Sequence, residues 1–197
     1  MKTQTAPCRL SALCFTAITL CCLSSLPATT NDFAILRLYA GGGASPADHI
    51  PATNAYLDTV TGIALDAAGN VYYCDQGPIT VRRIDATTRE VTTVAGKPGE
   101  FGYDGDGGPA TNATLANPMG LALDGAGENL YFADSFNHCI RKVHLPSGII
   151  STLVGDGNPG TYNEGDGGPA NLARLNSPEG VAVASNGDVY IADTLNY

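Results

Sequence analysis

The stretch LALDGAGENLYFAD (121–134) appears three times in this chain, with changes at a few positions. Its other copies are IALDAAGNVYYCD (63–75) and VAVASNGDVYIAD (181–193). The aspartates that end the copies are evenly spaced along the chain: Asp75, Asp134 and Asp193. Long matches at a fixed period indicate a repeat protein, in which neighbouring units stack on one another.

A second motif lies in the segments between these copies. GDGGPA occurs at 105–110 and again at 165–170. PATNATL (109–115) is matched by PATNAYL (51–57). Because these copies recur at nearly the same interval as the first motif, each repeat is expected to contain a Gly-rich link as well as the apolar stretch.

The best copy of the repeat has the pattern of short β-strands, since its apolar residues alternate in short runs. Four strands are expected at 120–124, 130–134, 139–145 and 149–155. Gly125, Gly127 and the Pro-Ser-Gly turn at 146–148 favour tight hairpins between them. The next link, 156–178, is long. Four antiparallel strands followed by one long link describe a blade of a β-propeller.

These residues resemble the NHL-repeat β-propellers, in particular the long-loop variety found in teneurin-like extracellular proteins and in secreted bacterial proteins. The resemblance rests on GDGGPA, on Ala-x-Leu-x-x-Pro-x-Gly, on Gly-x-x-Tyr-x-Ala-Asp, on NHCIRKV (137–143) and on GIISTLVG (148–155). It covers nearly all of 35–197 and implies an all-β fold of four-stranded antiparallel blades, six in a complete propeller. A fold of this kind does not by itself specify a function.

The repeat predicts how the chain is divided. Residues 29–197 are expected to be the N-terminal part of a longer propeller, truncated here. Its parts are expected to be a strand of the closing blade at 35–41, blades at 62–96 and 120–155, and a partial blade at 180–197. Two positions depart from the repeat. The first blade reads DQGPITVRRID (75–85), without the Asn-His pair, and Ala184 replaces the aspartate found at Asp66 and Asp124.

The N-terminal segment 1–28 has the features of a secretory signal peptide. Lys2 and Arg9 precede an apolar segment, 10–26, which is followed by Pro and small residues. A secreted or extracellular protein is therefore expected, with an uncleaved membrane anchor or a later anchor as the alternative. Removal of the two basic residues changes the formal net charge from −9 to −11.

The acidic balance, ten Lys+Arg against nineteen Asp+Glu, argues against nucleic acid and against anionic lipid as partners. Only Cys74 and Cys139 lie outside the signal segment, too few for a disulfide framework. They are interpreted either as a pair or as two buried thiols. Asn112 begins the sequence Asn-Ala-Thr and is a candidate for N-glycosylation in a eukaryotic secretory pathway.

Strand direction predicts where a binding site would lie. In an antiparallel blade, the long links and the turns between the second and third strands share one rim, and the two tight hairpins share the other. Long loops on a rigid scaffold usually carry binding. The candidates on this rim are Tyr103, Asp104, Tyr162 and Glu164. The alternative is that the loops only pack on adjacent blades.

The repeated charged residues are expected to be structural. Asp75, Asp134 and Asp193 end a strand and are expected to accept hydrogen bonds from the following turn. Arg82 and Arg141 recur on the third strand at the interval of the repeat, as do Arg83 and Lys142, and one member of each pair is expected to bridge to such an aspartate. Because these residues recur with the repeat, they are not interpreted as a catalytic set.

Two places in the chain carry candidate metal ligands. Asp104, Asp106 and Asp166 in the Gly-rich links offer the oxygen ligands that calcium prefers, but a structural turn also explains the motif. In related hydrolases and lyases a channel metal is held at the start of the first strand, where this chain has Thr61, Met119 and Glu179. Only Glu179 is a possible ligand there, so no cofactor is expected, with calcium as the alternative.

No Gly-x-Ser-x-Gly, His-Glu-x-x-His or Cys-His motif is present, so the expectation leans away from an enzyme. The expected function is a secreted or surface-exposed scaffold that binds a protein or a glycan through its long-loop rim. The alternatives are a metal-dependent hydrolase or lyase with a central-channel site, and the sensor ectodomain of a membrane receptor.

Overall fold

The structure is a computed structural model that describes residues 21–23, 36–38, 40–161 and 164–196. The predicted signal peptide therefore lies outside the described residues, except for strand β1 (Cys21–Leu23). This strand pairs antiparallel with β2 (Leu36–Leu38) in a separate two-stranded sheet. The segment 35–41 resembles a fourth blade strand in sequence, whereas β2 within it is short and has β1 as its partner.

Two complete four-stranded antiparallel units follow. Blade 1 consists of β4 (Val60–Leu65), β5 (Val71–Asp75), β6 (Thr80–Ile84) and β7 (Glu90–Ala95). Blade 2 consists of β8 (Pro118–Leu123), β9 (Asn129–Asp134), β10 (Cys139–His144) and β11 (Ile149–Val154). In both, consecutive strands are neighbours in the sheet. A hairpin of β12 (Pro178–Val183) and β13 (Val189–Asp193), here called blade 3, comes last.

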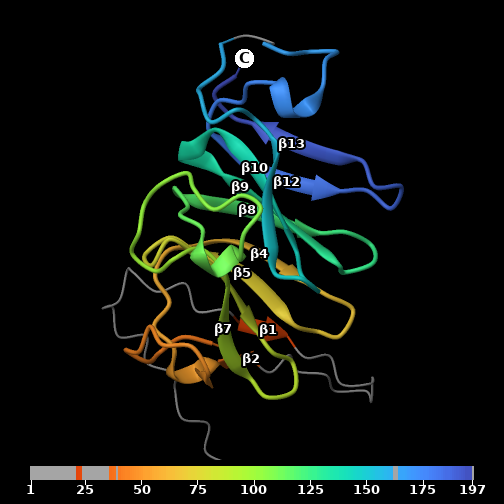
Figure 1. The fold of residues 1–197 in the computed structure, drawn as a ribbon. Helices are drawn as coiled ribbons and strands as arrows, with labels where there is room; N and C mark the ends of the chain where they lie inside the picture. Colours follow the sequence, from red (N-terminus) through yellow and green to blue (C-terminus); the bar gives the residue numbers. More distant parts are fainter. Residues whose placement is uncertain (1–20, 24–35, 39, 162–163, 197) are drawn as a thin grey trace, which may run out of the picture.

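The prediction of an all-β propeller fold is confirmed. The strands of blade 2 begin and end close to their expected positions. In Figure 1, β4, β8 and β12 succeed one another from the middle of the molecule to the top, as stacked blades require. Besides β-strands, the described residues contain single-turn 3₁₀ helices: η1 (Ala52–Asn54), η2 (Ala110–Asn112), η3 (Ser135–Asn137) and η4 (Ala170–Leu172).

The core lies mainly between the blades. One buried cluster joins the face of blade 1 that carries Tyr72 and Cys74 to the face of blade 2 that carries Leu130 and Phe132. A second cluster joins the other face of blade 2 to the β12–β13 hairpin. Cys74 and Cys139 are both buried and both free, so the interpretation as unpaired thiols is confirmed.

The links before blades 1 and 2 each cover the outer edge of the blade that they precede. Gly107 donates a hydrogen bond to the carbonyl of Ile150, and Ile150 donates one back to Gly108. In blade 1 the equivalent segment is strand β3 (Ile50–Pro51), which pairs with β7. An exposed strand edge is open to pairing with other chains. The link therefore protects the edge while it connects one blade to the next.

The strand ends define the two rims that the sequence predicted. The hairpin turns of β4–β5, β8–β9 and β12–β13 point to the right in Figure 1, whereas the links before blades 1 and 2 lie to the left and the link before blade 3 lies at the top. Here the long-loop rim denotes links 42–59, 97–117 and 156–177 together with the turns after β5, β9 and β13. Among the described residues, no helix has the length and apolar character needed to cross a membrane.

Candidate functional site: the long-loop rim

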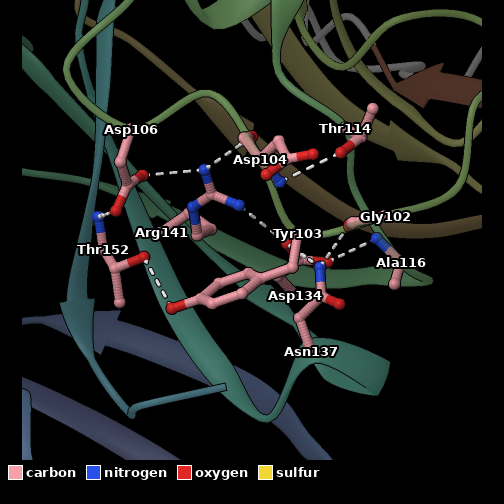
Figure 2. A network of polar contacts seen from close by, with 10 residues as sticks. All are labelled: Gly102, Tyr103, Asp104, Asp106, Thr114, Ala116, Asp134, Asn137, Arg141 and Thr152. Atoms are coloured by element: carbon pink, nitrogen blue, oxygen red, sulfur yellow. Dashed lines mark hydrogen bonds and ion pairs between the residues drawn. The ribbon is translucent and has the colours of Figure 1, made fainter.

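Arg141 fixes the position of the long link before blade 2 (Figure 2). Arg141 on β10 donates through Nη2 to Asp106 Oδ1 at 2.8 Å and to the carbonyl of Asp104 at 3.4 Å. The other oxygen of Asp106 accepts the backbone N–H of Thr152 at 2.8 Å. The aspartate of GDGGPA therefore ties the link to strands β10 and β11, and both of its oxygens have protein donors.

The same arginine reaches the aspartate that ends β9. Arg141 Nη1 donates to Asp134 Oδ2 at 3.2 Å, and this oxygen also accepts from Asn137 Nδ2 at 2.8 Å. Asp134 Oδ1 accepts the backbone N–H of Ala116 at 2.6 Å. Burial raises the pKa of Asp134 to about 6, although the bonds from Asn137, Ala116 and Arg141 each lower it. The predicted bridge and the predicted bond from the turn are thus both present in blade 2.

Blade 1 repeats the clamp with a different aspartate. Arg82 donates to Asp48 Oδ1 at 3.0 Å, and Asp48 Oδ2 accepts the N–H of Thr93 at 2.9 Å. Asp48 precedes the PATNAYL copy as Asp106 precedes PATNATL. Of the pair Arg82 and Arg141, only Arg141 bridges to a strand aspartate. Arg82 has no ion pair with Asp75, because its remaining bonds go to the carbonyls of Pro46 and Ala47.

Asp75 consequently differs from Asp134 in its partners. Its Oδ1 accepts the N–H of Asp58 at 3.2 Å, but its buried Oδ2 has no hydrogen-bond partner among the described residues. Burial raises the pKa of Asp75 to about 6, while the backbone N–H groups of Asp58 and Gly77 and the charge of Arg82 oppose that rise. In blade 3, Asp193 follows the pattern of blade 2, with bonds from the Asn176 N–H and from Asn196 Nδ2.

The predicted rim candidates are held by contacts within the protein. Tyr103 is 40% exposed and its ring lies 5.4 Å from the Arg141 guanidinium carbon, while its hydroxyl contacts Thr152 Oγ1. The carbonyl of Asp104 accepts from Arg141, and its N–H donates to Thr114 Oγ1. Glu164 pairs with Arg174 and accepts from Thr161. Tyr162 lies outside the described residues.

The remaining candidates do not lie together, since Asp166 and Asn112 are in different links and Glu179 is on β12. Asp166 and Glu179 are both exposed, and Asn112 is exposed at the end of η2, a position compatible with a glycan. Among the residues that the structure describes, no group of three or more His, Cys, Asp or Glu side chains could hold a metal ion. The predicted site residues are thus brought together only around Arg141, where they stabilise the loop.

The structure also reveals rim residues that sequence reasoning missed. Phe101 is 64% exposed, Phe136 on η3 is 58% exposed, and Tyr56 is 45% exposed. With Tyr103, they place four of the five exposed aromatic side chains among the described residues on the long-loop rim, the fifth being Tyr190 on β13. The sequence carried a signal for these residues: aromatic side chains at loop positions are not needed to pack the strands, so they could have been considered as binding residues.

The geometry of this rim suits recognition more than reaction. Aromatic side chains stand on loops that form ion pairs with the buried arginines Arg82 and Arg141, so a ligand would meet a preorganised surface. Tyr and Phe are enriched in the cores of protein interfaces. A pocket of about 470 Å³ opens on the same rim, lined by Ala44, Pro46, Tyr56, Asp58, Gly77 and Pro78.

Comparison with known proteins gives the following matches. Residues 89–164 match the family described as "Teneurin NHL domain", and residues 175–197 match "NHL repeat". The chain is 27% identical over 170 residues to "Protein SUPPRESSOR OF QUENCHING 1, chloroplastic" of Arabidopsis thaliana, covering 82% of this chain and 16% of that protein. It is 30% identical over 132 residues to "NHL repeat-containing protein 2" of Gallus gallus, covering 64% and 18%.

The chain thus spans less than a fifth of the length of these two relatives. Among solved structures, a structural genomics protein of unknown function from Bacteroides thetaiotaomicron superposes with a TM-score of 0.54 at 25% identity. That likeness covers 64% of this chain and 30% of the other.

Proposed function

The chain is an NHL-repeat β-propeller protein, and from this premise we propose that it is a binding scaffold that holds a protein or glycan ligand on its long-loop rim. The observation that carries the proposal is the gathering of Tyr56, Phe101, Tyr103 and Phe136 on loops that are held in place by ion pairs to two buried arginines, Arg82 and Arg141. Exposed aromatic side chains on a rigid frame bind with little loss of conformational entropy. The mechanism is recognition of shape without turnover.

A location outside the cell, secreted or at the cell surface, is part of the proposal. It is supported by the basic start and the apolar segment at 10–26, and by the match of 89–164 to a domain of teneurins. The test is to express the full chain in secreting cells and to determine the N-terminus of the protein in the medium. We expect a new N-terminus between positions 24 and 30. Retention of the whole product inside the cell would contradict this location.

The binding role is tested with arrays of glycans and of extracellular proteins. The wild type is compared with a Phe101→Ala/Phe136→Ala variant and with Thr87→Ala, an exposed substitution in the hairpin turn between β6 and β7 on the opposite rim. We expect at least one ligand that the wild type and Thr87→Ala bind and the double variant does not. Ligands bound equally by all three proteins, or lost only in Thr87→Ala, would overturn the assignment of the rim.

A further inference from the structure

Blade 1 differs from blades 2 and 3 at the turn after its second strand. In blade 2, Asn137 Nδ2 donates to Asp134 Oδ2 at 2.8 Å and to the carbonyl of Gly102 at 2.7 Å. In blade 3, Asn196 Nδ2 donates to Asp193 Oδ2 at 2.9 Å. Each turn thus carries an amide that fills the space above the aspartate and satisfies its second oxygen.

Pro78 stands at this position in blade 1 and has no donor to offer. The turn itself is unchanged, since Ile79 N–H bonds the carbonyl of Gln76 as His138 N–H bonds that of Ser135. The consequence is local: Asp75 Oδ2 is left buried without a hydrogen-bond partner among the described residues. A buried unpaired carboxylate oxygen is costly, and its presence calls for an explanation.

Two further differences between blades 1 and 2 leave space and add a negative charge beside Asp75. Backbone bonds from Asp58 and Ala116 to the strand aspartates show that these two residues are equivalent, and Gly77 likewise corresponds to Phe136. Blade 1 therefore carries a glycine in place of a phenylalanine and an aspartate in place of an alanine. Gly77 is needed, because a Cβ there would lie 2.4 Å from Asp58 Oδ2.

The result is the pocket of about 470 Å³ on the long-loop rim. Its walls are Ala44, Pro46, Pro78 and the ring of Tyr56, and the Asp58 carboxylate lies among them. Asp75 lies just behind Asp58, close enough for the Asp58 charge to raise its pKa. The Arg82 guanidinium, whose positive charge lowers the pKa of Asp75, is bonded to Asp48, Pro46 and Ala47. The pocket is therefore apolar at the sides and negative at one end.

We propose that this pocket binds a lysine or arginine side chain of a partner protein. The aliphatic stem of such a side chain matches the proline and alanine walls. Its charged head matches the Asp58 carboxylate, of which Oδ1 accepts from Thr59, and the half-exposed ring of Tyr56. These groups would provide a charge-assisted hydrogen bond and a cation–π contact. The inference rests on the proposed function, since it assigns part of the long-loop rim to one feature of a protein ligand.

The test uses two blocked tripeptides, acetyl-Gly-Arg-Gly-amide and the analogue in which citrulline, uncharged but of the same shape, replaces arginine. We expect calorimetry to detect binding of the arginine peptide, with the citrulline peptide about tenfold weaker. Asp58→Asn and Tyr56→Leu should each weaken arginine binding. Glu128→Gln, which removes the same charge from an exposed turn on the other rim, should not.

Pro78→Asn provides a test in which a loss of binding cannot be attributed to partial unfolding. The substitution restores the residue of blades 2 and 3, so its amide is expected to fill the pocket and to bond Asp75. We expect this variant to lose peptide binding while its melting temperature rises. No detectable binding of the arginine peptide, equal binding of the citrulline peptide, or unchanged binding by Asp58→Asn or Pro78→Asn would overturn the inference.

Failure of the inference is distinguishable from failure of the proposed function. If an array ligand depends on Phe101 and Phe136 but not on Asp58, the rim still binds and the basic-side-chain pocket is refuted. If no ligand depends on Phe101 and Phe136, the proposed function fails, whatever the peptides do.

Discussion

Asp75 and Asp134 occupy equivalent positions in consecutive blades but differ in their hydrogen-bond donors. Asp134 accepts from Ala116, Asn137 and Arg141, whereas Asp75 has one unpaired oxygen. Removing one partner of a buried charged pair leaves the other without compensation. Two residues that look alike in the sequence should therefore respond differently to the same substitution.

We expect Asp134→Asn to lower the free energy of unfolding by about 1–3 kcal/mol, because an amide cannot accept from all three donors. Asp75→Asn is the matched control and should cost less, since the amide nitrogen replaces an oxygen that has no partner. Chemical denaturation of both variants at pH 7 measures the difference. Equal losses, or an unchanged Asp134→Asn protein, would contradict the structural role of this network.

The stability of the protein should also depend on pH through Asp75. Burial raises the pKa of this carboxyl to about 6, above its ordinary value of 3.8. Between these values the folded state holds a proton that the unfolded state releases, so this group stabilises the fold fully at low pH and less as pH rises through 6. Its contribution to the free energy of unfolding is expected to fall between about pH 3.8 and pH 6 and to level off at higher pH.

Denaturation midpoints of the wild type and Asp75→Asn across that range check this prediction. The free energy of unfolding of Asp75→Asn should decline less with rising pH than that of the wild type. His138 acts in the opposite direction, because burial lowers its pKa. The readout is therefore the difference between the two proteins at each pH. A constant difference would show that Asp75 does not titrate in this range.

At the scale of the elements, the first hairpin of each complete blade is closed by side chains in its own turn. Asp66 accepts from the N–H and the amide of Asn70, and Asp124 from those of Asn129. Although burial opposes the change, these bonds hold the pKa values of both aspartates below the usual value. Blade 3 has Ala184 and Asp188 at these positions, and its turn is closed instead by bonds between Asn186 and Asp188.

The pair Ala184→Asp/Asp188→Asn should restore the clasp in the β12–β13 hairpin and raise the free energy of unfolding by about 0.5–1.5 kcal/mol. Ala184→Asp alone should give less, since two carboxylates would then face each other across the turn. Thermal unfolding of the two variants shows whether the double variant is more stable than the single variant. A single variant as stable as the double would show that the asparagine contributes nothing.

At the scale of the whole molecule, the blades approach each other closely at the glycines of their first strands. A Cβ on Gly62 would lie 2.4 Å from the carbonyl oxygen of Met119, and one on Gly120 would lie 2.6 Å from that of Glu179. These glycines bring the innermost strands into backbone contact. A larger residue would force neighbouring blades apart.

We expect Gly120→Ala to lower the free energy of unfolding by roughly 1–3 kcal/mol, as overpacking does. Gly125→Ala, in the adjacent hairpin turn, is the control, because nothing lies within 4 Å of a Cβ there. Differential scanning calorimetry of both variants distinguishes them. Similar melting temperatures would mean that the blades do not meet as closely as Gly120 indicates.

The amino-acid sequence alone determined the propeller fold, the strand positions and the two rims of this protein. These features are encoded locally, by apolar alternation within Leu121–Asp134 and by turn residues such as Gly125 and Gly127. Local signals survive in every copy of a repeat. They therefore predicted the blades even where blade 1 departs from the motif.

Only the tertiary structure decided which side chains meet. Arg82 and Arg141 occupy equivalent positions in the sequence, but their ion pairs differ. Arg82 pairs with Asp48 and not with Asp75, whereas Arg141 pairs with both Asp106 and Asp134. Likewise, the pocket beside Tyr56 results from three small changes in segments that are separate along the chain: Asp58, Gly77 and Pro78. Such contacts depend on how links and turns from different parts of the chain come together in space, and no local pattern carries that information.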